Sequence, residues 1–301
     1  MLFFVFFLLF FGTADEFTPV GICAILTMGP VSVIPGLKRW ARQLTICKKD
    51  YIGIMQEKEI FIMSDVVKRG YSPKDEEEFQ RQADKLADAG RDLFYLVNRG
   101  YPAKNASVFI GNHYMLSERQ RLALVRTVAP EDILAARRAK EKTRLEPGST
   151  VYIDCFNTII SLEIAFSGST LLRCMDGTVG DLAGLRGTYR LIDKTDPAIL
   201  TIRRVLEEEK AGRAHFLIDA PVSNSGRLKA RIADLFEGSP VRTEFSVIKD
   251  VDRTLYGKEN VVSSDGVVLD HCRSWFNLTA KGIRAELGDY PYVEIMHSES
   301  L

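Results

Sequence analysis

Three stretches in the second half of this chain share the pattern of a short buried strand that ends in an aspartate. They are residues 151–153 before Asp154, residues 215–218 before Asp219, and residues 261–264 before Asp265. Helical spacing follows the first stretch, and further strand and helix patterns alternate behind it. Strict alternation of this kind predicts parallel strands joined by right-handed crossovers. The sequence therefore predicts an α/β fold with a mainly parallel, Rossmann-like sheet.

The position of these aspartates predicts a metal site. The carboxyl ends of parallel strands meet at one edge of a sheet, where open α/β sheets place ligands and catalytic groups. Mg²⁺ or Mn²⁺ prefers oxygen ligands and can activate a water against a phosphate. A turn or cap explains any one acid alone, and Asp219 precedes a turn sequence. Recurrence of the pattern favours Asp154 and Asp265 as ligands, together with Asp252, which opens a short helix. Asn157 is expected to hold a water or a phosphate oxygen.

Two other residues behind the first strand bear on the chemistry. Phosphatases of the haloacid dehalogenase type carry an acid–base aspartate two residues after their nucleophile. That place is taken here by Phe156, so this phosphatase chemistry is not favoured. Glu163 lies one helix face further on and is expected on the surface.

Composition limits the classes of protein to consider. With 46% hydrophobic and 27% charged residues among 301, the chain is typical of a globular protein. Its formal net charge is zero, so no global field attracts nucleic acid or an acidic membrane. Binding of RNA would therefore need a local basic patch.

Residues 133–145 supply one such patch, with five basic residues against a single glutamate. A solvated helix face or a linker is the ordinary explanation of such a segment. The alternative is contact with RNA phosphates, for which Arg137 and Arg138 are candidates.

A glycine-rich stretch over residues 176–190 is a second candidate for substrate contact. It has neither the Walker spacing nor the G-x-G-x-x-G fingerprint of nucleotide-binding loops. We expect a long functional loop or a small hairpin, with Asp176 and Arg190 facing the substrate.

The cysteines indicate the redox compartment. There are five, an odd number, and no two have C-x-x-C spacing. This pattern argues against a disulfide framework and against a cysteine zinc site, so no disulfide partner is expected. It fits a reducing compartment, and the predicted location is the cytoplasm.

The first 62 residues differ from the rest. Residues 1–11 are almost wholly apolar, and residues 20–37 are apolar but interrupted by two prolines. The first run is shorter than the roughly 20 residues of a spanning helix and lacks basic residues ahead of it. Three interpretations remain open: an extension outside the folded protein, a membrane anchor or uncleaved signal through residues 1–37, or a packed part of the fold. Met55 or Met63 would be the natural start in the first case.

Residues 63–146 have helical patterns with tight turns, and Ser117 with Gln120 has the spacing of a capping box. A plain helical bundle is favoured over a helix-turn-helix arrangement. We place a domain boundary after Glu146, so that a small helical domain (63–146) precedes an α/β domain (147–301).

Two families share motifs with this chain. The strings RGYSP, DLFYLVNRGYPAKNAS and GNHYMLSERQRLAL, within residues 64–144, resemble the prokaryotic family called domain of unknown function 434. The strings IDCFNTIISLEIAFSG, DGTVGDLAGLRGTYR, LIDAPVSNSG and VVSSDGVVLD, within residues 151–271, resemble its companion, domain of unknown function 5616. Neither name implies an activity.

The second half is also similar, more distantly, to the NYN branch of the PIN-like nucleases. That branch has an Asp and a nearby Asn after its first strand, an Asp after a middle strand, and a K-x-x-D-x-x-L helix start followed by a strand ending S-x-D. The matching residues here are Asp154, Asn157, Asp219, Lys249, Asp252, Leu255, Ser263 and Asp265.

The resemblance implies metal-dependent cleavage of RNA, with Mg²⁺ or Mn²⁺ held by Asp154, Asp252 and Asp265. Asp219 would assist catalysis. Many members have a second acid two residues after the last one, and Val267 takes that place here. A non-catalytic nucleic-acid-binding or scaffold module on the same fold is therefore the alternative.

Overall fold

The computed structural model describes residues 68–70, 72–183 and 187–296. The expectations for residues 1–62 lie outside this part of the chain. Within it, no helix is both long and apolar enough to cross a membrane. All of these described residues belong to one compact unit.

The chain first forms a group of helices. Their bounds are α2 Pro73–Arg81, α3 Ala83–Val97, α4 Ala103–His113, α5 Glu118–Thr127 and α6 Glu131–Lys140. Helix α5 begins with the predicted capping box, in which the Ser117 side chain accepts from the Gln120 backbone N–H and the Gln120 side chain accepts from the Ser117 N–H. Buried apolar residues of these helices, including Leu86, Leu93 and Leu124, form a core of their own.

The main sheet has six parallel strands in the order β1-β8-β7-β2-β5-β6. The strands are β1 Glu141–Lys142, β2 Thr150–Asp154, β5 Arg213–Asp219, β6 Arg242–Ile248, β7 Val261–Val262 and β8 Trp275–Phe276. The predicted parallel α/β sheet is thus confirmed. The strands β2, β5 and β7 are the ones that the aspartate pattern predicted.

The strand order reverses direction next to β2. From β2 the chain moves outward to β5 and β6, then returns to β7 on the other side of β2 and continues to β8. Such a reversal is the topological switch point of a doubly wound sheet, where the loops diverge and leave a crevice at the carboxyl ends. Here the switch point lies between β2 and β7, which lead into Asp154 and Asp265.

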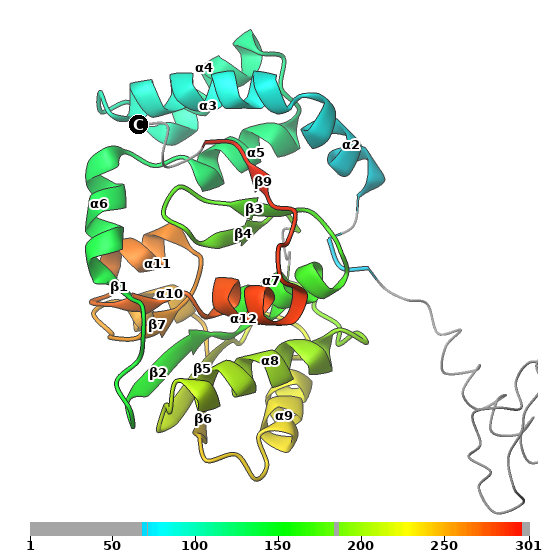
Figure 1. Cartoon of the computed structure of the whole chain (residues 1–301), viewed down its shortest axis with the longest axis vertical. Coiled ribbons are helices and arrows are strands. Elements are labelled where there is room, and N and C mark those ends of the chain that lie inside the picture. The colour runs from blue at the N-terminus through cyan, green and yellow to red at the C-terminus, as the bar shows by residue number, and fades with distance from the viewer. Residues whose placement is uncertain (1–67, 71, 184–186, 297–301) are drawn as a thin grey trace, which may run out of the picture. The chain divides into compact units, whose positions relative to one another are not determined.

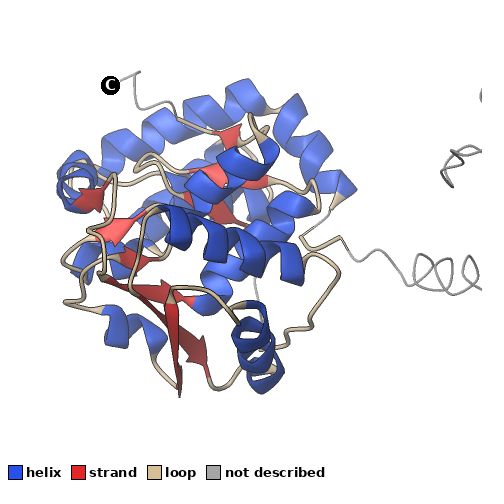
Figure 2. Ribbon diagram, turned by 60° about the horizontal axis from the view of Figure 1, so that its bottom comes forward, coloured by secondary structure: helices blue, strands red, loops and turns tan. Residues whose placement is uncertain are grey.

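Helices cover both faces of this sheet (Figures 1 and 2). On one side α7 Cys155–Phe166, α8 Thr195–Glu208 and α12 Leu278–Leu287 contact one another, and α9 Ser225–Leu235 contacts α8. On the other side α10 Val251–Leu255, α11 Gly266–His271 and α6 make a second set of contacts. Helix α7 has ten buried positions of twelve, so it is the central helix of the main core.

A second, three-stranded sheet interrupts the alternation. Strands β3 Leu171–Arg173 and β4 Val179–Asp181 form an antiparallel hairpin, and β9 Val293–Glu294 adds in parallel to β3. Residues 171–173 are a strand, but they belong to this second sheet and not to the main one. Leu172 packs into the core of the helical segment, so this small sheet joins the helices to the α/β part.

The helical segment also contributes to the main sheet, because β1 directly follows α6 and pairs with β8. Helix α6 of the helical segment also contacts α11 of the α/β part. The domain boundary after Glu146 stays a prediction.

Candidate functional site

Four aspartates lie along the carboxyl edge of the main sheet, and we call them the acid cluster. Asp154 ends β2 beside Leu217, and Asp219 ends β5 beside Ile248. The other two follow the same edge: Asp252 lies in the first turn of α10, and Asp265 precedes α11. The four acids therefore come from four successive connections that leave one edge.

Asp154 is the most buried member of the acid cluster, with 5% of its surface exposed. Burial, together with the negative charges of Asp219, Asp252 and Asp265, raises the pKa of this carboxyl to about 7. The hydroxyl of Ser263 opposes these effects by donating a hydrogen bond to Asp154 Oδ2 at 2.8 Å. The fold thus holds a carboxyl where its ionised form is disfavoured.

The acid cluster is coupled electrostatically. Burial raises the pKa of Asp219, and the charge of Asp252 adds to the effect. Burial likewise raises the pKa of Asp252, with repulsion from Asp265 and Asp250. Like charges raise one another's pKa when they lie near each other, so these directions agree with the placement of the four acids along one edge of the sheet.

The loop between β7 and α11 is fixed by hydrogen bonds. The hydroxyl of Ser263 accepts from the Asp265 N–H at 3.1 Å while donating to Asp154. Asp265 Oδ1 accepts from the N–H of Val267 at 2.7 Å and so caps α11. Asn157 Oδ1 accepts from the Ser264 N–H at 2.8 Å, which ties α7 to this loop. The predicted ligand-positioning oxygen of Asn157 is therefore engaged within the protein.

No ion pair with a described residue neutralises any member of the acid cluster, although many other carboxylates of this chain have such partners. A hard divalent cation binds oxygen ligands and relieves the repulsion between neighbouring carboxylates. In the described part of the chain, however, no three His, Cys, Asp or Glu side chains are already arranged to hold a metal ion. The carboxylate oxygens are the type of ligand that Mg²⁺ or Mn²⁺ prefers, but the four side chains are not arranged to coordinate a single ion.

Asp176, the acid of the glycine-rich stretch that was predicted to face substrate, lies apart from the acid cluster. Asp176 is 6% exposed and sits in the turn of the β3–β4 hairpin, where Oδ1 accepts from the Thr178 N–H and hydroxyl. Its other oxygen pairs with Arg137 Nη1 at 2.8 Å. Arg137 also pairs with Asp270 of α11, through Nε at 2.7 Å and Nη2 at 3.1 Å. We call this set of three residues the Arg137 link.

The other basic candidates differ in their surroundings. Arg138 donates to the Met175 carbonyl at 3.3 Å. The side chain of Arg190 is exposed, and its contact with substrate stays a prediction. Lys140 and Arg144 line a depression together with three residues that immediately precede β2, β7 and β8, which are Ser149, Asn260 and Ser274. These residues mark the amino edge of the sheet, so Lys140 and Arg144 lie at the edge opposite to the acid cluster, whereas Arg137 donates to the Gly266 carbonyl, next to Asp265, at 3.1 Å.

Glu163 does not lie on the surface as expected: it is fully buried. Its Oε1 accepts from the Tyr189 hydroxyl at 2.7 Å and from Thr195, and Oε2 pairs with Arg69. Burial raises its pKa in spite of these partners. Arg69 comes from far along the chain, so no local pattern could have indicated this pairing.

Asp250 belongs near the site but was not among the predicted residues. It caps α10 by accepting from the Arg253 N–H at 3.2 Å, and its charge raises the pKa of both Asp219 and Asp252. Its position two residues before Asp252 was the signal that the sequence offered.

Comparison with known proteins places these features in a family. The family described as "Protein of unknown function (DUF434)" matches residues 85–140, and "Domain of unknown function (DUF5616)" matches residues 144–281. The two matches meet close to the predicted boundary after Glu146. No solved structure matches the chain significantly.

An uncharacterised protein of Methanocaldococcus jannaschii is 34% identical over 185 residues, which span 61% of this chain and 88% of that protein. This chain therefore belongs to the same family as the archaeal protein.

Proposed function

We propose that the α/β part of this chain is a metal-dependent ribonuclease of the PIN/NYN-like type. The observation that carries the proposal is the acid cluster: four carboxylates along the carboxyl edge of the sheet, two of them at the topological switch point, for which the described residues supply no ion pair. Unbalanced carboxylates cost stability, and such costs are concentrated at functional sites. The choice of RNA as substrate rests on the resemblance of the strand-end motifs to the NYN branch.

The residues have distinct roles in this proposal. Asp154, Asp252 and Asp265 would hold Mg²⁺ or Mn²⁺, which supplies an activated water and neutralises charge on the phosphate. Asp219 would orient that water from the neighbouring strand end. Asn157 keeps α7 and the Ser263–Asp265 loop together, so it positions the acids rather than the substrate.

Ser263 has a positioning role. Its hydroxyl bridges the Asp154 carboxylate and the Asp265 backbone, so it fixes the distance between two of the three proposed ligands. The pairing of Ile153 with Val262 fixes the register of β2 and β7, so the residues that follow these two strands lie side by side.

A non-catalytic nucleic-acid-binding or scaffold module is the second candidate. Two observations favour it: Val267 replaces the second acid of the last strand and is 53% exposed, and no three donors in the described residues are closed around a metal position.

Manganese-dependent cleavage of RNA separates the two candidates. We expect purified protein to cut single-stranded RNA with Mn²⁺ and to lose this activity in EDTA. Asp154→Asn and Asp265→Asn should each lower the rate by a hundredfold or more, because each removes a charged metal ligand. Glu259→Gln is the matched control, since this exposed carboxylate lies beside the amino edge.

Unchanged cleavage in both aspartate variants would contradict the assignment. Absence of cleavage by a folded wild-type protein, with RNA binding retained, would instead favour the non-catalytic module. Circular dichroism of each variant checks that the fold is preserved.

A further inference from the structure

The exposed aromatic side chains of the described chain lie together in the helical segment. Among the tyrosine, phenylalanine and tryptophan residues that the structure describes, only three are exposed: Tyr95 at 57%, Tyr101 at 58% and Phe109 at 70%. All three fall within residues 95–109, from the last turn of α3 to the middle of α4. Scattered apolar residues are normal on a protein surface, whereas exposed rings that gather in one place indicate a binding site.

The three rings lie on neighbouring parts of one surface. Helices α3 and α4 contact each other and are joined by residues 98–102, so they form an antiparallel pair (Figure 1). At one end of this pair the Tyr114 hydroxyl donates to Asp92 at 2.8 Å. Tyr95 is three positions after Asp92 and therefore lies on the same side of α3, beside α4. Tyr101 precedes α4, and Phe109 lies away from the buried positions of that helix, which are 106, 107, 110 and 111.

Basic residues accompany the rings. Residues 88–127 contain six basic residues against three acids, in a chain whose formal net charge is zero. The guanidinium of Arg99 lies over the Tyr95 ring at 4.5 Å, and Lys104 is exposed at the start of α4. Among the described residues, neither Arg99 nor Lys104 has an ion pair with a carboxylate, whereas Asp88 is paired with Arg91. We call the surface formed by Tyr95, Arg99, Tyr101, Lys104 and Phe109 the α3–α4 surface.

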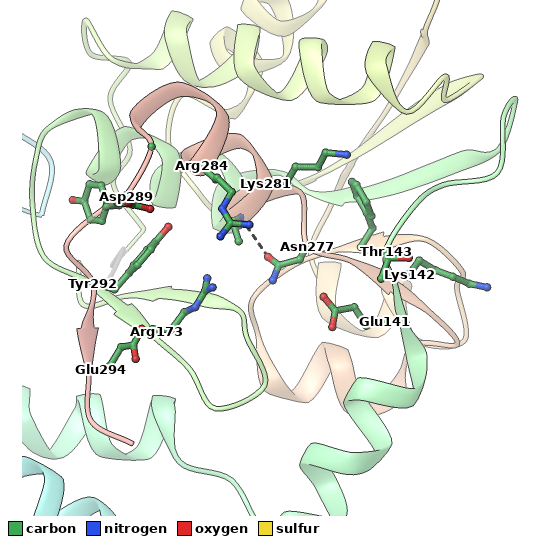
Figure 3. Close-up of a pocket in the computed structure, with 14 residues that line it drawn as sticks. Glu141, Lys142, Thr143, Arg173, Asn277, Lys281, Arg284, Asp289, Tyr292 and Glu294 are labelled. Atoms are coloured by element: carbon green, nitrogen blue, oxygen red, sulfur yellow. Dashed lines mark hydrogen bonds between the residues drawn. The ribbon is translucent and has the colours of Figure 1, made fainter. Parts of the chain in front are cut away.

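The charges of a large cavity elsewhere in the described chain are balanced instead. This cavity of about 590 Å³ is lined by β1, β8, α12 and the small sheet (Figure 3). One of its cations, Lys281, pairs with Glu209 outside the lining. The others are matched in number by carboxylates: Lys142, Arg173 and Arg284 against Glu141, Asp289 and Glu294. The cavity therefore has no excess charge to attract a polyanion, in contrast with the α3–α4 surface.

The turn at the end of α4 has a fixed shape. Arg121 of α5 donates to the carbonyls of Gly111 and Leu116 at 3.0 Å each, and to Asn112 Oδ1 at 2.8 Å. Within this turn Met115 has a φ of +50° and a side chain that is 84% exposed. Residues other than glycine rarely adopt this left-handed conformation, and strained positions cluster at binding sites. A partner meets a preformed surface, which favours binding because little has to be ordered.

Single-stranded RNA has the chemistry that this surface fits. Bases stack on exposed aromatic rings and on arginine planes, and phosphates bind the basic residues between them. In a duplex the base faces are already covered by stacking, so the exposed rings favour a single strand. A second copy of the chain fits less well, because its approach would bring Arg99 and Lys104 of both copies together.

We propose that the α3–α4 surface binds single-stranded RNA, with bases stacked on its three rings and phosphates held by Arg99 and Lys104. The choice of RNA rests on the proposed function, for which this surface supplies substrate binding. The binding itself needs no residue of the acid cluster.

Fluorescence anisotropy of a short labelled single-stranded oligoribonucleotide tests the surface in EDTA, where metal-dependent cleavage is blocked. Phe109→Ala should weaken binding roughly fivefold or more at every salt concentration, because a stacked base is lost. Lys104→Gln should lower the slope of log affinity against log salt by about 0.7, as one lost phosphate contact predicts. The matched controls are Leu200→Ala, at an exposed leucine of α8, and Arg227→Gln, at an exposed arginine of α9, and both should bind as wild type does.

A duplex of the same sequence should bind less tightly than the single strand. Equal affinity for the duplex, or unchanged affinity in both Phe109→Ala and Lys104→Gln, overturns the proposal. If Phe109→Ala converts a wild-type dimer to a monomer in light scattering without changing RNA affinity, the surface is a contact between two copies and the proposal is wrong.

Failure of this proposal is distinguishable from failure of the nuclease proposal. Wild-type protein that binds RNA through the α3–α4 surface but cleaves none contradicts only the nuclease proposal. Cleavage with Mn²⁺ by a protein whose RNA affinity is unchanged in Phe109→Ala and Lys104→Gln contradicts only the binding surface.

Discussion

The acid cluster and the Arg137 link each contain one buried aspartate, Asp154 and Asp176, but only Asp176 has a cationic partner among the described residues. In the link, one guanidinium pairs with the buried Asp176 at 2.8 Å and with the partly exposed Asp270 at 2.7 Å, so each carboxylate has a cationic partner. In the cluster, burial and mutual repulsion raise the pKa of Asp154, Asp219 and Asp252, and no described cation pairs with them.

The two sets of charges have different roles. The paired charges of the Arg137 link stabilise the fold, whereas the unpaired carboxylates of the acid cluster do not. A balanced buried pair connects segments, and here Arg137 joins α6 to the β3–β4 hairpin and to α11. A carboxylate without a counter-charge does not stabilise the fold, so its presence is explained better by a functional role. The same contrast explains why Arg137, although basic and close to acids, is a poor candidate for RNA contact.

Removal of Arg137 should have the largest effect on stability. Arg137→Met leaves Asp176, whose side chain is 4% exposed, without its cation, and breaking a buried pair in this way costs about 3–5 kcal/mol. Urea denaturation measures the free energy of unfolding. The control Arg227→Met should change it by less than about 0.5 kcal/mol, as is usual for exposed positions. A loss equal to that of the control would show that the link is not structural.

The pH dependence of stability should reveal the acid cluster. The pKa of Asp154 is about 7 in the folded protein against an ordinary value of 3.8. The folded state therefore binds this proton more tightly than the unfolded chain, so the contribution of Asp154 is lost as pH rises from about 4 to 7. Asp154→Asn lacks the titration. In EDTA it should become more stable than wild type above pH 7, by up to about 4 kcal/mol.

Denaturation of both proteins between pH 4 and 8 measures this gap. A constant gap across that range would mean that Asp154 titrates normally and that the cluster is solvated. A gap that grows with pH but disappears on addition of Mn²⁺ would sharpen the comparison, because a cation would then replace the missing counter-charge.

The parts of the fold that depend on local pattern could be predicted from the sequence. Strands β2, β5 and β7 were indicated by apolar runs, and parallel pairing followed from their alternation with helices. The convergence of Asp154 and Asp265 followed as well, since parallel strands deliver their ends to one edge. The metal itself and the nuclease activity stay predictions.

The parts that depend on distant pairing could not be predicted. Strand β1 has two residues and exists only because it pairs with β8, more than a hundred positions later. Arg137 is separated by 133 positions from Asp270, and Glu163 is separated by a similarly long stretch from Arg69. No periodicity or propensity reports such contacts, so these residues were assigned to substrate or to the surface by default.

A substitution that adds charge to the acid cluster should have a smaller effect but tests the comparison most directly. Val267 is exposed in the first turn of α11, where its backbone N–H donates to Asp265. In Val267→Asp, the new carboxylate would lie near the positive end of a short helix, which is worth less than about 1 kcal/mol. It would also lie close to Asp265, which opposes that gain, so stability without metal should change little.

The response to Mn²⁺ should change more, because a further carboxylate near a cation strengthens binding. We expect Val267→Asp to bind Mn²⁺ several-fold more tightly in calorimetric titration and to raise the thermal midpoint further at the same Mn²⁺ concentration. Val108→Asp is a matched control, since this valine is equally exposed at 53% but lies on α4. If both variants respond to Mn²⁺ alike, the added charge acts through the general field of the protein. A response confined to position 267 would show that the carboxylates at this edge of the sheet, and not the surface around Val108, attract the divalent cation.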